Sequence, residues 1–264
     1  MTSLANHQSK EFTKLLLMGD SKSGKTGALA SLVPDYNLGI LDYDNGLDAL
    51  AIIIGRDNPK LLDKVHFRTL RDRYMMTAAG PVISGTATAF IEGSRMIDHW
   101  KHGDEDLGAP GTWGKDWIFV LDSLTFMADA AFNFREPLVP RSRDGKYDVR
   151  AVYKDAQDAT ESVLAYVTSE SFRTNVIVIS HVRYVDNPDG TKKGYPTAVG
   201  SALSPSIPRY FNSVALTLTG AGGKRQIQTA ATAMIDLANP ASFKMLPTLP
   251  IESGLATFFK TLRS

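Results

Sequence analysis

Short apolar runs that end in polar or small residues are the main pattern along this chain. Most of them lack a strict apolar–polar alternation, which is typical of strands buried on both faces of a parallel sheet. Alanine-rich or helically spaced segments separate several of these runs, and such an alternation of strand and helix favours an α/β fold. We therefore predict a mostly parallel central sheet flanked by helices. Its strands are expected at residues 15–18, 38–42, 65–70, 117–123 and 175–181.

The rest of the chain divides into helices, loops and paired strands. Residues 213–219 and 224–229 alternate around a glycine-rich turn, which predicts an antiparallel hairpin toward the C-terminus. Residues 182–200 are expected to form a hairpin or a loop. Residues 1–13 are polar and are expected to be a flexible segment before a single domain of residues 14–264. Helices are predicted at 27–32, 90–100, 124–134, 151–171 and 254–262, a helix or buried run at 47–54, and loops at 71–86, 102–116 and 135–150.

The first apolar run leads into the pattern Gly-x-x-x-x-Gly-Lys-Thr at residues 19–26. A strand before this pattern and a helix after it are the context that a phosphate-binding loop requires. Backbone N–H groups converge on the phosphates in such a loop, Lys25 adds a charge, and Thr26 offers a hydroxyl to Mg²⁺. The alternative is a glycine-bearing turn that matches by chance. The predicted ATP-binding residues are Gly19, Asp20, Ser21, Lys22, Ser23, Gly24, Lys25, Thr26 and Gly27.

Two aspartates follow other predicted strands, where α/β sheets gather their ligand groups. Asp122 follows the apolar run 118–121 and is predicted to hold Mg²⁺ together with Thr26. The alternative is an N-cap for the next helix, a role that Ser123 is also able to take. Asp44 is the candidate general base or water-orienting carboxylate. Its alternative is an Asx turn with the two residues after it.

His181 ends the last of the predicted parallel strands. A histidine there is able to sense the γ-phosphate by hydrogen bonding, and the alternative is a histidine that is satisfied within the fold. The predicted catalytic residues are therefore Lys25, Asp44, Asp122 and His181.

Two stretches rich in cations lie beyond these sites. The first, residues 135–150, follows the helix after Asp122, and the second, residues 182–194, follows His181. Cations with tyrosines nearby are able to grip and stack single-stranded nucleic acid, whereas the alternative is two solvated polar loops. The candidate DNA-binding residues are Arg135, Arg141, Arg143, Lys146, Arg183, Lys192 and Lys193.

The composition sets limits on these interpretations. The formal net charge is +1, so any nucleic-acid binding must use local patches of charge. Cysteine is absent, which excludes disulfides and thiolate zinc sites and fits a reducing cytoplasm. The N-terminus lacks the apolar core of a signal peptide, and no apolar run approaches the ~20 residues of a membrane helix. We therefore expect no membrane partner.

In four segments the sequence resembles the RecA family of recombinase ATPases. Residues 200–203 and 210–214 resemble the stretch after the family's second DNA-binding loop. Residues 40–48 resemble the family segment with a water-activating acid after the second strand, which falls on Asp44, and residues 118–123 resemble its Walker B strand. His181 falls at the family's γ-phosphate sensor. Asp48 matches an adenine-contacting position of the family. The chain differs from the family at two positions: the usual catalytic Glu is Asp44 here, and the aromatic residue expected three residues after Asp48 is Ala51. Over residues 14–220 the chain is most similar to the short RecA-like nucleotide-binding or single-strand annealing proteins of bacteriophages.

This resemblance implies a RecA-like P-loop core that uses ATP and Mg²⁺, binds single-stranded DNA and promotes annealing or strand exchange. It further implies a homo-oligomer on DNA, a single-strand binding protein as a second partner, and the cytoplasm of a bacterial host. One alternative is an ATP-switched binding module with negligible turnover, and another is a different P-loop ATPase of phage DNA metabolism. A GTPase or nucleotide kinase is a third, although the chain has no Asn-Lys-x-Asp guanine motif.

Overall fold

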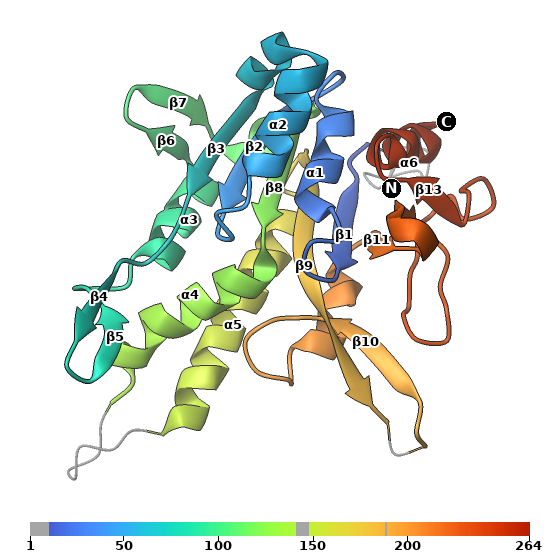
Figure 1. Ribbon diagram of the computed structural model, residues 1–264. Helices are drawn as coiled ribbons and strands as arrows, with labels where there is room; N and C mark the ends of the chain where they lie inside the picture. The colour runs from blue at the N-terminus through green and yellow to red at the C-terminus, as the bar shows by residue number, and fades with distance from the viewer. Residues whose placement is uncertain (1–10, 141–147, 188) are drawn as a thin grey trace, which may run out of the picture.

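Helices cover both faces of a nine-stranded sheet in the computed structural model of the protein (Figure 1). The structure describes residues 11–140, 148–187 and 189–264. Every neighbouring pair of strands from β11 to β3 is parallel, whereas β12, β13 and β10 pair antiparallel. In spatial order the strands are β13 (Thr248–Pro250), β12 (Arg225–Gln228), β11 (Ser213–Thr219), β1 (Lys14–Gly19), β9 (Thr174–Asp186), β8 (Gly114–Asp122), β2 (Asn37–Asp42) and β3 (Val65–Thr69), with β10 (Lys192–Pro196) beside the end of β9.

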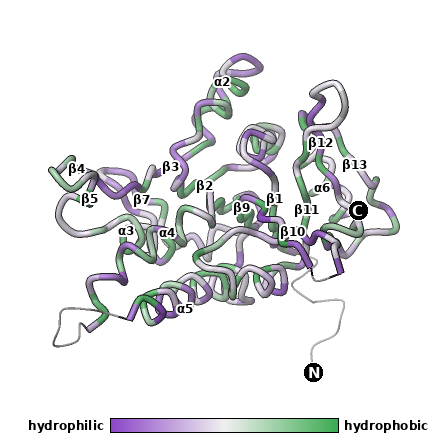
Figure 2. Tube along the Cα trace, turned by 60° about the horizontal axis from the view of Figure 1, so that its bottom comes forward, coloured by the Kyte–Doolittle hydropathy of each residue, from purple (hydrophilic) through white to green (hydrophobic). Residues whose placement is uncertain are grey.

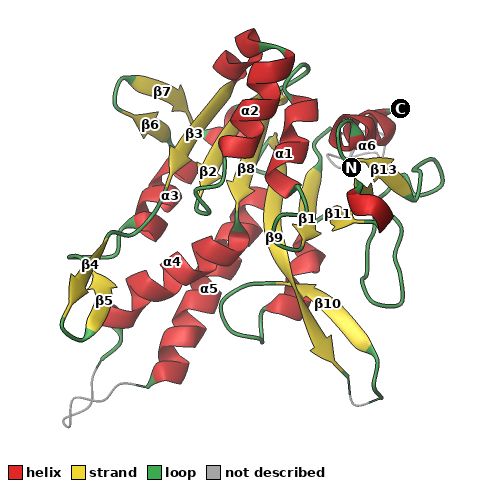
Figure 3. Ribbon diagram, in the orientation of Figure 1, coloured by secondary structure: helices red, strands yellow, loops and turns green. Residues whose placement is uncertain are grey.

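The helices form one layer on each face of the sheet (Figure 3). One face is covered by α3 (Ala89–Asp98), α4 (Leu124–Arg135) and α5 (Val149–Thr168), and the other by α1 (Lys25–Ala28), α2 (Asp48–Asp57) and α6 (Gly254–Arg263). Two small hairpins stand outside the main sheet: β4 (Tyr74–Thr77) with β5 (Gly80–Ile83), and β6 (Trp100–His102) with β7 (Glu105–Gly108). Short 3₁₀ turns lie at Leu29–Leu32, Pro59–Lys64, Pro110–Thr112, Glu136–Leu138, Ser204–Tyr210 and Ala221–Gly223.

Two hydrophobic cores explain why the strands lack alternation. Successive side chains of a strand point to opposite faces. Leu16 and Met18 of β1 therefore enter the core under α3, α4 and α5, while Leu15 and Leu17 enter the core under α1, α2 and α6. All four are completely buried or nearly so. The predicted α/β class with a mostly parallel, helix-flanked sheet is confirmed, and so is the antiparallel pair toward the C-terminus.

Several predicted boundaries were wrong. The expected loop at 71–86 contains the β4–β5 hairpin, while the β6–β7 hairpin begins at Trp100, inside the expected helix 90–100, and continues into the expected loop at 102–116. Apart from the buried Trp100, the strands of both hairpins are too short and exposed to show a burial pattern. The expected loop at 135–150 was wrong at both ends, because α4 includes Arg135, a 3₁₀ turn follows at Glu136–Leu138, and α5 begins at Val149. β9 runs five residues beyond His181, where it pairs with β10, so residues 182–187 and 189–196 belong to a hairpin. The first helix begins at Lys25 and tightens into a 3₁₀ turn.

Lys14 anchors the amino end of β1, although its charge gave no reason to expect a buried residue. Its Nζ donates to the carbonyl oxygens of Val167 at 3.0 Å, Phe172 at 2.6 Å and Thr174 at 2.9 Å. Burial lowers the pKa of Lys14 to about 7. Just before it, Thr13 N donates to Asn175 Oδ1 at 3.1 Å. The part of the predicted flexible segment that the structure describes is therefore fixed to the sheet.

None of the helices in the described ranges combines the length and the apolar character needed to cross a bilayer.

Candidate functional site

The carboxyl ends of the parallel strands bring the predicted polar residues into one row. Asp42 on β2 lies opposite Asp122 on β8 in the strand register, and Gly19 on β1 lies opposite His181 on β9. Because β9 lies between β1 and β8, the strand with His181 separates the phosphate loop from Asp122. The expected convergence of these residues on one edge of the sheet is confirmed.

The loop between β1 and α1 depends on two glycines for different reasons. Gly24 has φ +96°, in the left-handed region that side chains disfavour. A Cβ on Gly19 would lie 2.1 Å from Thr217 Oγ1 of β11, so only glycine fits beside that strand. Ser23 Oγ shares a hydrogen bond of 2.6 Å with the same threonine hydroxyl and donates to Asp20 O at 2.8 Å. The loop is therefore fixed to β11 as well as to its own strand.

Lys25 is buried and turned into this loop. Its Nζ donates to the carbonyl oxygens of Gly19 at 3.0 Å and Asp20 at 2.7 Å. Burial lowers the pKa of Lys25, and the carboxylates of Asp122, Asp44 and Asp20 oppose that shift. Since its direct partners among residues 11–140, 148–187 and 189–264 are carbonyl oxygens alone, this ammonium group is well suited to bind an anion that enters the loop.

Asp122 and Thr26 meet across the loop. Thr26 Oγ1 donates to Asp122 Oδ2 at 2.6 Å, whereas Asp122 Oδ1 is buried without a hydrogen-bond partner in the described part of the chain. Burial raises the pKa of Asp122 to about 7; the carboxylates of Asp44 and Asp42 add to the rise, while the Thr26 hydroxyl and Lys25 oppose it. A divalent cation would give Oδ1 a partner and favour the ionised form. The donor atoms therefore fit Mg²⁺.

Protein ligands alone do not form a metal centre here. Among the described residues, no group of three or more His, Asp or Glu side chains is arranged to hold a metal ion. Mg²⁺ is usually held by one or two protein groups, with waters and phosphate oxygens filling its other positions. Thr26 and Asp122 match that smaller requirement.

Ser123 occupies the N-cap position of α4, but its side chain makes no capping hydrogen bond. Its Oγ is buried and has no hydrogen-bond partner within the described residues. Asp122 does not cap the helix either, because its Oδ2 accepts from Thr26. The capping alternative for these two side chains is therefore wrong.

The Asx turn is made by Asp42 rather than Asp44. Asp42 Oδ1 accepts from the backbone N–H groups of Asn45 at 2.7 Å and Gly46 at 3.3 Å. Its Oδ2 accepts from Thr69 Oγ1 at 3.0 Å. The half-buried Asp44 carboxylate makes no hydrogen bond within the described chain. The turn alternative for Asp44 is therefore wrong, and its carboxylate is available to a water or ligand.

His181 faces the same site from β9. Its Nδ1 lies 3.3 Å from Thr125 Oγ1, which also accepts from the His181 backbone N–H at 3.2 Å. Burial lowers the pKa of His181, and the charge of Lys25 acts in the same direction, while Asp44 opposes the shift. The imidazole is therefore neutral near pH 7 and keeps one N–H to donate. Lys25 and Asp44 therefore both influence the protonation of His181.

A cavity of about 710 Å³ extends from the phosphate loop along α1. Gly24 and Gly27 line it on one side, and α2 lines it with Ala49 and Ile53. Asp48, the predicted adenine contact, precedes Ala49 but does not line the cavity. The opposite wall comes from Gly223, Lys224, Arg225, Ile251, Glu252, Ser253 and Ala256. These residues were not predicted, since they lie far along the chain from the phosphate loop.

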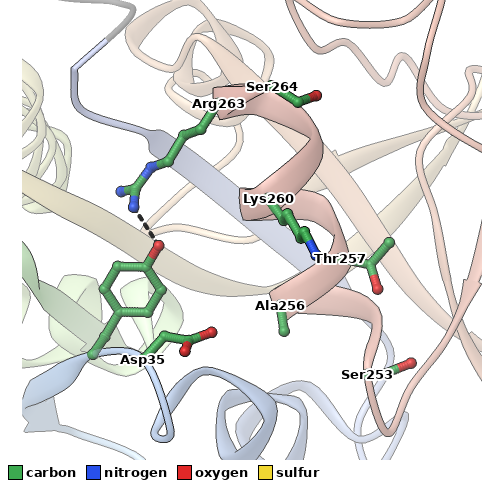
Figure 4. Close-up of a pocket in the computed structure, with 8 residues that line it drawn as sticks. Asp35, Ser253, Ala256, Thr257, Lys260, Arg263 and Ser264 are labelled. Carbon is green, nitrogen blue, oxygen red and sulfur yellow. Dashed lines mark hydrogen bonds between the residues drawn. The ribbon is translucent and has the colours of Figure 1, made fainter.

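A second cavity, of about 470 Å³, adjoins the first at the start of α6 (Figure 4). Ser253 and Ala256 line both cavities. Arg263 reaches across the second cavity and donates to the hydroxyl of Tyr36 and, at 2.9 Å, to Asn175 Oδ1. Because this guanidinium is already satisfied by the fold, we assign it a structural role.

The predicted DNA-binding cations differ in their surroundings. On the β9–β10 hairpin, Lys192 lies 3.6 Å from Asp186, and Lys193 lies 2.7 Å from Asp236. Arg183 forms no salt bridge within the described residues. It borders a cavity of about 240 Å³ between the hairpin and residues 201–205. Arg135 lies at the end of α4 with its guanidinium over the Phe134 ring. Arg141, Arg143 and Lys146 lie outside the described residues.

Some residues of the site gave no recognisable signal in the sequence. Thr125, Thr217 and Arg71 act through contacts between distant segments, and Arg71 donates to the backbone oxygen of Asp44 at 3.2 Å. Asp42 was identifiable only as the last polar residue of its strand. With the geometry established, comparison with protein-family models gave no match, and comparison with curated proteins found no similar chain.

Proposed function

We propose that this protein is a Mg²⁺-dependent ATPase with a RecA-like P-loop core. The observation that carries the proposal is the hydrogen bond from Thr26 to Asp122 at the sheet edge that also holds Lys25 in the phosphate loop, with His181 and Asp44 at or just after the ends of neighbouring parallel strands. A buried ammonium, an unpartnered carboxylate oxygen and an unbonded second carboxylate are the groups that nucleoside-triphosphate hydrolysis requires. The cavity beside Gly24 supplies room for the nucleoside.

The chain's own residues divide the reaction among them. Lys25 and the loop backbone bind the phosphates, and Thr26 with Asp122 would hold Mg²⁺, which neutralises phosphate charge when bound. Asp44 orients the attacking water and accepts its proton, because its carboxylate has no other partner in the described residues. His181 donates its N–H to the γ-phosphate and thereby links the nucleotide to β9 and the hairpin beyond it.

The DNA-related part of the proposal is that the protein binds single-stranded DNA and promotes annealing or strand exchange. It is supported by the position of the β9–β10 hairpin, which continues directly from His181. Arg183 supplies a cation without a salt bridge among the described residues, with Tyr195 opposite it on β10. These are the two side-chain types that hold a single strand without sequence preference.

One titration tests both parts of the proposal. ATP turnover should be measured with increasing single-stranded DNA, after a competition panel of ATP, GTP and nucleoside monophosphates has identified the bound nucleotide. We expect ATP to be preferred and DNA to stimulate its hydrolysis. Failure of every nucleotide to bind would contradict the P-loop assignment. Turnover without any response to DNA would leave the ATPase and remove the DNA-related function.

An ATP-switched binding protein with negligible turnover is a second candidate. The observation that favours it is the short reach of Asp44, because an aspartate extends one methylene less than the glutamate of the resembled family. Nucleotide-dependent DNA binding in the absence of measurable phosphate release would identify this candidate.

A further inference from the structure

The β4–β5 hairpin has an exposed apolar surface that neither the fold nor the nucleotide site uses. The two strands pair only with each other, and Figures 1 and 2 show them projecting beside the ends of α3 and α4. Residues 74–83 contain no charged side chain. A contiguous exposed apolar patch, unlike a single exposed apolar side chain, marks a binding surface.

Both faces of this hairpin are apolar and accessible. Tyr74 and Met76 share one face and are 59% and 77% exposed, respectively. Met75 and Val82 are cross-strand partners on the other face and are 51% and 42% exposed. A surface that docks onto another protein needs only one apolar face. A thin element with two apolar faces is instead suited to insertion between two apolar layers.

The charges at the base of the hairpin favour a polyanion. Arg71 and Arg73 lie immediately before β4, and neither forms a salt bridge within the described residues. Asp72, between them, is turned inward: its Oδ1 accepts from the backbone N–H groups of Thr88 at 2.9 Å and Ala89 at 3.0 Å. The base therefore carries two arginines against one carboxylate that is turned inward, and the tip is apolar.

The hairpin is on the same sheet edge as the proposed nucleotide site. It follows the carboxyl end of β3, whose Thr69 lies in register with Asp42. At its base, Arg71 donates to Asp44 O at 3.2 Å, and its guanidinium lies 5.8 Å from the centre of the Phe126 ring. A single strand of nucleic acid held at this edge of the sheet would therefore have access to the hairpin.

We propose that the β4–β5 hairpin is a wedge that inserts between neighbouring bases of a single nucleic-acid strand, while Arg71 and Arg73 contact its phosphates. Apolar wedges of this kind unstack base steps, and cations beside them hold the backbone. The inference rests on the proposed binding of single strands but assigns the base contacts to an element outside the two basic stretches.

Two face variants test the wedge. Tyr74→Ser with Met76→Ser removes one apolar face, and Met75→Ser with Val82→Ser removes the other. A matched control, Phe243→Ser with Leu246→Ser, changes two residues that are 81% and 62% exposed on a different part of the surface. The probes are a fluorescein-labelled oligothymidylate, the same strand with abasic sites, and a strand containing 2-aminopurine.

We expect each face variant to bind the intact strand roughly tenfold more weakly, the effect of losing about one stacked base. Both should bind intact and abasic strands alike, whereas the parent and the control prefer the intact strand. The parent should also raise 2-aminopurine emission through unstacking, and the face variants should not. Circular dichroism would verify that each variant keeps its fold.

Other outcomes overturn the wedge. They are unchanged discrimination between intact and abasic strands, an effect of one face alone, or a loss of self-association without a change in base preference, which would assign the hairpin to a second copy of the chain. The assay is run with and without nucleotide. If single-strand binding does not depend on nucleotide, the proposed nucleotide switch is contradicted, but the wedge is still tested. If the parent binds no single strand, the wedge is overturned, and ATP turnover is measured separately.

Discussion

The phosphate loop and the β9–β10 hairpin lie at the same edge of the sheet, yet their cations are held in opposite ways. Lys25 is buried, and its direct partners are the carbonyl oxygens of Gly19 and Asp20. Lys193 on the hairpin is instead held by a carboxylate, that of Asp236. Within the described residues, the first region presents a charge that has no counterion in direct contact, whereas the second presents a charge that is already paired with a carboxylate.

This difference decides how much each region gains from an anionic ligand. A buried ammonium that exchanges carbonyl oxygens for phosphate gains a charge-assisted bond in a site of low dielectric. A surface lysine must first leave its carboxylate, and surface ion pairs are worth about 0–1 kcal/mol in either arrangement. Mutations in the loop should therefore have large effects, and mutations of the paired hairpin lysines should have small ones.

The largest effect is expected for Asp44→Asn. The amide cannot accept a proton, so ATP turnover should fall by a factor on the order of 100, as for a lost general base. Nucleotide binding should remain near the parent value, because Asp44 does not belong to the phosphate loop. Phosphate release and fluorescent-nucleotide binding measure the two quantities separately. Turnover at the parent rate would show that Asp44 does not activate water.

Lys25→Ala should weaken ATP binding by a factor of about 10 or more, because a charge-assisted contact to the phosphates is lost. Isothermal titration calorimetry measures this change. Lys154→Ala is the matched control, because it removes a lysine charge at an exposed position of α5, on the other face of the sheet from α1. Equal affinities for the parent and a folded Lys25 variant would contradict the loop assignment.

Asp122→Asn should reduce Mg²⁺-dependent nucleotide binding and remove its pH dependence. Because the pKa of Asp122 is raised to about 7, the parent should bind Mg²⁺–nucleotide more weakly as the pH falls below 7.

The folding stability of the nucleotide-free protein should change with pH in the opposite direction, since a carboxyl with a raised pKa makes folding less favourable as the pH rises from about 4 to 7. Free Asp122→Asn should therefore melt at a higher temperature than the parent at pH 8. Differential scanning calorimetry checks this, and a lower melting temperature would contradict the assigned burial.

The smallest effects are expected on the hairpin, where they rank the cations. The salt dependence of single-strand binding is the slope of log K against the logarithm of the salt concentration. Arg183→Ala should reduce the magnitude of this slope by about 0.7, the value for one lost phosphate contact. Lys193→Ala should change it less, because Asp236 competes for the same ammonium. Fluorescence anisotropy at several salt concentrations measures both slopes. A larger change for Lys193→Ala than for Arg183→Ala would reverse the ranking.

Sequence reasoning succeeded where a local pattern carries the physics. The apolar runs predicted the buried strands, and their order along the chain predicted that Asp122 and His181 would meet the phosphate loop. It failed where contacts join distant segments, as between Ser23 and Thr217. It also failed at one local turn: the backbone N–H groups that Asp42 binds are only three and four residues away, yet nothing in the sequence ranks it above Asp44.

The β4–β5 hairpin and the buried Lys14 illustrate two further limits. An exposed hairpin lacks the burial pattern from which strands are recognised, so residues 74–83 looked like a loop. A charged residue in a core is predictable only when its partners are known, and those of Lys14 lie more than 150 residues later in the chain. The ion pairs of Lys192 and Lys193 were similarly invisible.

The unbroken length of β9 has a mechanical consequence. The strand has 13 residues and no glycine or proline, and β-branched side chains stiffen much of it. From His181 to its end at Asp186, five residues span roughly 17 Å at about 3.3 Å per residue. With no hinge along this length, a small rotation of the backbone at His181 becomes a larger displacement at the tip, as in a lever. The length of β9 therefore sets how far the tip moves for a given rotation at His181, and its lack of glycine and proline limits bending along the way.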